Sequence, residues 1–95
     1  MDDVPTPKAP ELLGRAASLL TERGKNYDRP EGERSMSKTV DAFNVITGLG
    51  MTETQGWLFM MCLKQVRAFT GVVPHEDSLH DLIAYAALMA EEGLA

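Results

Sequence analysis

Two pairs of charged residues in the second half of the chain have types and spacings that could do chemistry. Lys64 and Arg67 stand three apart in the most apolar stretch, WLFMMCLKQVRAF (57–69), and no other Lys or Arg follows position 50. Asp77 and Asp81 stand four apart further along. Residues at these spacings share one face of a helix. The cations could therefore bind a phosphate, replace metal-binding acids, or neutralise the two aspartates within the fold.

The elements that must position these residues are helical. Apolar residues recur at helical spacing over four segments, about 10–24, 35–48, 52–70 and 76–92, and strand signals are almost absent. Ser35 or Ser37 can cap the second helix, and Thr52-Glu53-Thr54-Gln55 is a capping box for the third. The fold class is therefore predicted as all-α, a compact bundle of four helices with short loops. Residues 1–8 are predicted as a polar tail and 9–95 as one helical domain.

The connection between the third and fourth helices is short, so these helices are predicted to form an antiparallel hairpin. This hairpin sets Lys64 and Arg67 at heights similar to those of Asp77 and Asp81, and intramolecular ion pairing is the favoured interpretation. A ligand site made of the same residues is the alternative. The 52–70 segment is apolar on most sides, which favours a central position. Consecutive helices joined by short loops are expected to pack antiparallel, and Cys62 is expected to be a buried, inert thiol.

Composition limits the classes of function. The net charge of −5 and pI of about 4.9 argue against a general nucleic-acid binder. A single cysteine excludes a disulfide framework and a cysteine-rich zinc site. No apolar run reaches the roughly 20 residues that span a bilayer, so we expect a soluble, cytoplasmic protein. We also expect no cofactor and no metal. His75 and His80 are not spaced as paired metal ligands, which favours surface or capping roles.

The segment NYDRPEGERSM (26–36) is a second candidate surface, because binding residues concentrate on loops. It presents an acidic, hydrogen-bonding set of side chains, and Gln55 is expected to lie near it. The set comprises Tyr27, Asp28, Glu31, Glu33 and Ser35. Such a loop could dock against arginines that normally hold a nucleic-acid backbone, and a solvated loop without a partner is the alternative.

Three blocks in order carry a family resemblance over about residues 10–92: Arg23-Gly24-Lys25 with Tyr27-Asp28 and Pro30, then Leu63-Lys64 with Val66-Arg67, then Asp77, Asp81 and 84–88 (AYAAL). They resemble a family of small phage and prophage proteins of unknown function. That family is distantly similar to the all-α nucleoside triphosphate pyrophosphatases of MazG type, whose Glu-x-x-Glu and Glu-x-x-Asp motifs bind magnesium. Here Lys64 and Arg67 stand in place of the first motif, and Ser78 occupies the position three before Asp81. This departure implies that the chain has lost the metal centre and is not an enzyme.

The small all-helical frame, the acidity and the segment YDRPEGERSM (27–36), with Asp28 and Ser35, plus Gln55, resemble phage anti-CRISPR proteins that act on type I-F complexes. That resemblance implies an inhibitor that binds Cas proteins and blocks target-DNA hybridisation, without binding nucleic acid or a membrane itself. Asp28, Glu31 and Glu33 would pair with Cas arginines, Ser35 and Gln55 would donate or accept hydrogen bonds, and Tyr27 would make an apolar contact. The competing hypothesis is a nucleotide-binding or nucleotide-processing phage accessory protein, in which Lys64 and Arg67 hold phosphate. A homo-oligomeric structural or regulatory protein is the third, with a homodimer as one possible state.

Overall fold

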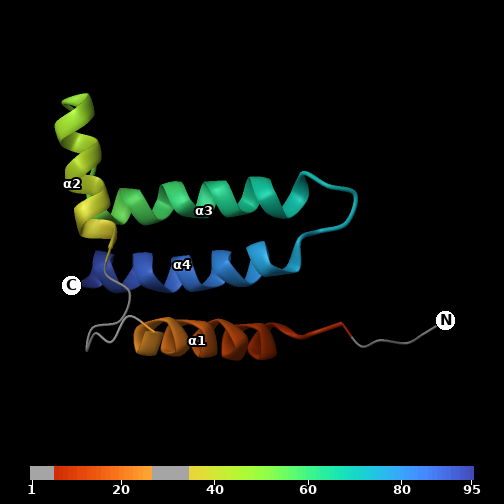
Figure 1. Cartoon of the computed structure of the whole chain (residues 1–95). Helices are drawn as coiled ribbons and strands as arrows, with labels where there is room; N and C mark the ends of the chain where they lie inside the picture. Colours follow the sequence, from red (N-terminus) through yellow and green to blue (C-terminus); the bar gives the residue numbers. More distant parts are fainter. Residues whose placement is uncertain (1–5, 27–34) are drawn as a thin grey trace.

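Four helices make up most of the part of the chain that the structure describes. The computed structural model describes residues 6–26 and 35–95, with the side chains of 23–26 not described. The helices are α1 (Ala9–Asn26), α2 (Met36–Thr47), α3 (Glu53–Phe69) and α4 (Glu76–Leu94), and no strand occurs among the described residues (Figure 1). The prediction of an all-α, four-helix fold is confirmed. None of these helices is long and apolar enough to cross a membrane.

The helices form a layer of three with the fourth across one end. α3 and α4 pack along each other in opposite directions, which confirms the predicted hairpin, and α1 lies along the other side of α4 (Figure 1). α2 crosses the first turns of α3 at a steep angle (Figure 1). Two expectations were wrong. Consecutive helices pack antiparallel only in the α3–α4 hairpin, and the helix with a neighbour on each side within the layer is α4, not α3.

The turn between α2 and α3 is held by the side chains of Asn44 and Thr47, and Thr47 Oγ1 accepts from the Leu49 amide at 3.2 Å. Asn44 Nδ2 donates to the carbonyl of Met51 at 2.9 Å, and the Met51 amide donates to Asn44 Oδ1 at 2.8 Å. Gly48 ends α2 with φ of 75°, in the left-handed region that favours glycine. The amide of Gly48 donates to the Asn44 carbonyl at 2.8 Å. The chain therefore leaves α2 and enters α3 along a defined path.

The helix starts follow local sequence signals. The predicted capping box is present: the Gln55 amide donates to Thr52 Oγ1 at 3.1 Å, and the Thr52 amide donates to Gln55 Oε1 at 2.9 Å. Ser35 is the N-cap residue of α2, although its side chain makes no capping hydrogen bond. His75 caps α4, where its Nδ1 accepts from the Ser78 amide at 3.3 Å. This agrees with the capping role expected for a histidine.

The core lies where α2, α3 and α4 meet. Its buried side chains are Met36, Val40, Trp57 and Leu88. Leu20, Met51, Met60, Tyr85 and Met89 pack around them and are partly buried. Ala68 and Ala84 are fully buried, and small side chains of this kind allow helix backbones to approach closely.

On one side of α3, no element of the described chain lies alongside. Phe59, Val66 and Phe69 are exposed, and so is Cys62. The expectation of a buried Cys62 was therefore wrong, and so was the expectation that the 52–70 helix is central. The reason is that α4 and α2 cover only two sides of a helix whose apolar residues continue round to a third.

Candidate functional site

The Lys64–Asp81 pair is the main charged feature of the α3–α4 interface. Lys64 Nζ lies 2.9 Å from Asp81 Oδ2, and the two side chains are only 13% and 15% exposed. Lys64 Nζ also lies 5.8 Å from the centre of the Tyr85 ring, within reach of a cation–π interaction. Tyr85 follows Asp81 by one helical turn, so a carboxylate and a ring on one face of α4 hold the same ammonium group.

The aromatic part of this cluster continues into the core. The rings of Tyr85 and Trp57 have centroids 5.4 Å apart and planes inclined by 36°, in the distance range typical of paired aromatic side chains. Trp57 is buried on α3, two turns before Lys64. The ion pair therefore lies between the hydrophobic core on one side and more polar surroundings on the other.

Those polar surroundings are a cleft of about 440 Å³ between α1 and α4. Its lining residues are Arg15, Leu19, Asp77, His80 and Asp81. From the described residues, the cleft receives the guanidinium of Arg15, the carboxylates of Asp77 and Asp81, and the imidazole of His80.

Arg15 joins the two helices that border the cleft. Its Nη2 lies 3.0 Å from Oε2 of Glu11 on α1, and its Nη1 lies 3.4 Å from Oε2 of Glu76 on α4. All three side chains are substantially exposed, so these pairs orient Arg15 and add little stability. Arg15 and Glu76 are 61 residues apart. No local pattern in the sequence could indicate this contact, and the sequence analysis did not include Arg15.

His80 is more buried than expected for a histidine in a surface or capping role. Its side chain is 13% exposed, and Nε2 is 3.6 Å from Oε2 of Glu76. Nε2 is buried without a hydrogen-bond partner among the described residues. Its position one turn after Glu76 on α4 turns it toward the cleft rather than toward open solvent.

The chemistry available in this region is limited by the ion pair. Within residues 6–26 and 35–95, no group of three or more His, Cys, Asp or Glu side chains is arranged to hold a metal ion. A divalent ion needs several oxygen ligands. The Asp81 oxygen that could contribute one is instead in contact with an ammonium group. The structure therefore supports charge pairing at this position.

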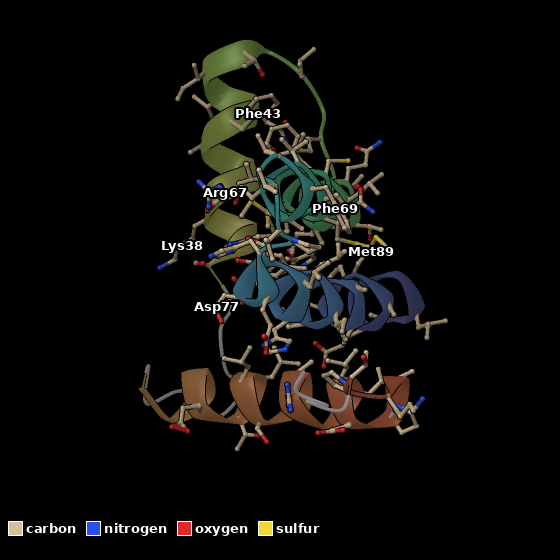
Figure 2. The ribbon with its side chains drawn as sticks, turned by 90° about the vertical axis from the view of Figure 1, so that its right-hand side faces the viewer. Lys38, Phe43, Arg67, Phe69, Asp77 and Met89 are labelled. Carbon is tan, nitrogen blue, oxygen red and sulfur yellow. The ribbon has the colours of Figure 1, made fainter. Side chains whose placement is uncertain are left out.

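Arg67 and Asp77 do not join the pair. Both side chains are exposed, and no ion pair links Arg67 to either aspartate in the described part of the chain. Lys64 points at α4, whereas three further residues turn Arg67 around α3 by about 60°. Figure 2 shows Arg67 at the level of α3, above Asp77 on α4. The sequence predicted that all four charges lie at similar heights along the hairpin. In the structure, the position of Arg67 around α3 turns it away from the Lys64–Asp81 pair, and Asp77 is exposed in the first turn of α4.

The predicted docking residues can be followed only in part. Tyr27, Asp28, Glu31 and Glu33 lie outside the described residues. Ser35 is exposed at the start of α2, and Gln55 is exposed in the first turn of α3, where its Oε1 serves the capping box.

The crossing of α2 and α3 relates these two residues in space. A Cβ on Gly56 would lie 2.5 Å from Met36 Sδ, so these two positions mark the crossing. Ser35 and Gln55 each lie one residue before it. Ser35 and Gln55 therefore both lie next to residues of the α2–α3 crossing.

The comparison with known proteins identifies a family without assigning an activity. A family model described as a domain of unknown function (DUF6378) matches residues 11–92. No curated protein and no solved structure matches the chain. The matched segment includes all of α2, α3 and most of α1 and α4. The protein therefore belongs to the DUF6378 domain family.

Proposed function

We propose that this protein is an inhibitor that acts by binding Cas proteins of a type I-F crRNA-guided complex, and that it blocks target-DNA hybridisation without catalysis. The observation that carries the non-catalytic part is the largely buried Lys64–Asp81 pair. In a MazG-type enzyme, acids at the position of Lys64 would help to hold magnesium. A lysine there repels a divalent ion and engages the carboxylate that remains.

The docking part of the proposal concerns the segment 27–35 together with Gln55. This segment has three acids, Asp28, Glu31 and Glu33, and a chain with net charge −5 is attracted to a basic groove. Charge complementarity of this kind sets the rate and specificity of association more than the final affinity. The rigid α2–α3 crossing beside Ser35 and Gln55 supports the idea, because it would present the acidic segment from a fixed base.

The experiment is co-purification with a purified type I-F Cas complex. We expect the wild-type chain to be retained and Asp28→Arg to lower the affinity about tenfold or more, because a carboxylate facing arginines becomes a repelled cation. Asp77→Arg is the matched control, since it makes the same charge change at an exposed position in the first turn of α4. Equal retention of wild type and Asp28→Arg, or no retention of wild type, would overturn the proposal.

A second candidate function rests on the α1–α4 cleft. Because Asp81 engages Lys64, Arg15 would be the phosphate-binding cation in a nucleotide-binding protein, with His80 and Asp77 beside it. Incubation with a nucleoside triphosphate mixture and magnesium, followed by detection of pyrophosphate and monophosphates, tests it. Hydrolysis that disappears in Asp81→Ala would place this function ahead of the inhibitor.

A further inference from the structure

The outer face of α3 is an apolar surface that no part of the described chain covers. We use this name for Leu58, Phe59, Cys62, Val66 and Phe69. These residues follow one another at spacings of mostly three or four and point away from α4. Phe59, Val66 and Phe69 are each 64% exposed, Leu58 is 50% exposed, and Cys62 is exposed. No charged residue belongs to this face, and Gln55 and Gln65 lie on it or at its edge.

A recess lies at one end of this face, where α2 and the α2–α3 turn approach α3. Its volume is about 450 Å³. The lining is almost entirely apolar and consists of Phe43, Leu49, Gly50, Met51, Gln55, Leu58, Phe59 and Cys62. Phe69 lies exposed at the other end of the face (Figure 2). The surface therefore has an apolar hollow near the start of α3 and an apolar side chain near its end.

We propose that the outer face of α3 forms a symmetric dimer with a second copy of this chain. The two α3 helices run antiparallel, with Cys62 at the twofold axis. Phe69 of each copy enters the recess of the other. This proposal does not rest on the proposed function, and it stands or falls separately from Cas binding.

The positions along α3 favour this arrangement. Phe69 follows Cys62 by seven residues and Gln55 precedes it by seven, so antiparallel pairing about Cys62 sets Phe69 against the partner's Gln55, which lines the recess. The same register sets Leu58 against the partner's Val66. Each copy would supply both the inserted Phe69 and the recess that receives it from the same surface, as an isologous twofold interface requires.

The exposed area is also close to what a stable dimer needs. An aromatic side chain has a surface on the order of 150–250 Å², and the side chains of Leu and Val are smaller. With the exposed fractions of Phe43, Leu49 and the outer face of α3, the apolar surface amounts to roughly 600 Å² per chain. A specific interface buries roughly 600–1,000 Å² per partner. A patch of this size is at the upper end of what monomeric proteins leave in contact with water.

Charge distinguishes a second copy from other occupants. Two chains that each carry −5 repel one another except where their surfaces are uncharged, and the outer face of α3 is such a place. A charged partner would have no opposite charge to bind on the outer face of α3. An interfacial membrane helix normally carries Lys and Arg beside its apolar face, whereas here only Lys64 and Arg67 lie on α3, and neither borders the outer face.

The first test measures mass in solution by light scattering on a sizing column. We expect wild type to run as a dimer at about 100 µM, and Phe69→Glu to run as a monomer. Val45→Glu is the matched control, because Val45 is exposed on α2 and does not line the recess. Circular dichroism checks that each variant is folded. A folded monomeric wild type, a dimeric Phe69→Glu, or open-ended polymers would each overturn the proposal.

The second test reads the direction of pairing by oxidative cross-linking. A disulfide needs Cα atoms roughly 4.4–6.8 Å apart, so Cys62 at the axis should link two wild-type chains. In a Cys62→Ser background, Leu58→Cys and Val66→Cys should cross-link when mixed and not when each is alone. Cross-linking of each alone, without the mixed product, would show parallel pairing and overturn the antiparallel dimer.

Discussion

At the scale of single residues, Lys64 places a largely buried positive charge between α3 and α4. Its ammonium group is in contact with Asp81 and lies over Tyr85, and little of either charged side chain reaches solvent. Charges removed from water in this way lose hydration that their mutual attraction must offset. Each partner therefore depends on the other, and loss of one affects stability more than it would in a surface pair.

The dependence can be measured with Lys64→Met. We expect the free energy of unfolding to fall by about 3 kcal/mol, because the carboxylate of Asp81 keeps its largely buried place without the cation. Urea denaturation gives the value. Arg67→Met is the control and should change the free energy by about 0.5 kcal/mol or less, since Arg67 is exposed. The double variant Lys64→Met/Asp81→Leu should recover most of the loss. An unchanged midpoint in Lys64→Met would mean that the ammonium group is solvated and available to a ligand.

At the scale of elements, the angle between α2 and α3 depends on one position without a side chain. Gly56 is buried against α2, and a Cβ there would lie 2.5 Å from Met36 Sδ and 2.8 Å from Val40 Cγ2. Real Cβ atoms do not approach other atoms so closely, so any larger residue must move Met36, Val40 or the whole of α2. Asn44 restrains the same crossing from the turn.

Gly56→Leu tests this crossing. We expect it to lower the free energy of unfolding by about 2 kcal/mol, because overpacking a close contact costs more than the gain in helix propensity. Gly14→Leu is the matched control on α1, where nothing lies within 4 Å of a Cβ. That substitution should be neutral or stabilise by up to about 1 kcal/mol. Thermal unfolding followed by circular dichroism compares the two, and equal midpoints would contradict the close approach.

At the scale of the whole molecule, the three-helix layer leaves α3, a helix with apolar residues on several sides, at an edge. α4 lies between α1 and α3, and α2 covers only the first turns of α3 (Figure 1). The outer face of α3 and the recess beside α2 then form one apolar surface on a chain of 95 residues. A small domain with so little covered surface has limited stability as a monomer, and association through this face would supply more buried apolar area.

The consequence for the whole molecule is a melting temperature that depends on concentration. Mass action stabilises a folded dimer as the protein concentration rises, so the midpoint of wild type should increase by a few degrees for each tenfold step. Phe69→Glu should melt at a lower temperature that does not change with concentration. A concentration-independent midpoint for wild type, measured by calorimetry across such a range, would contradict the dimer.

The sequence was sufficient for most of the helix bounds and for the capping box, which depend on neighbouring residues. The capping box at Thr52 and Gln55, the end of α2 at Gly48 and the α3–α4 hairpin follow from side chains within a few positions of one another. Local hydrogen bonds and helical periodicity have the same physics in any fold. For that reason the fold class and the placement of α2, α3 and α4 could be predicted to within a few residues.

Only the tertiary structure decided which side of each helix meets a neighbour. α3 is apolar nearly all round, so its pattern could not show that Trp57 is buried whereas Cys62 is exposed. The spacing of Lys64 and Arg67 could not show that only Lys64 faces Asp81. The Arg15–Glu76 contact joins residues 61 positions apart. These contacts depend on how α1, α2 and α4 pack in three dimensions. α3 has several apolar sides, and its neighbours cover only some of them.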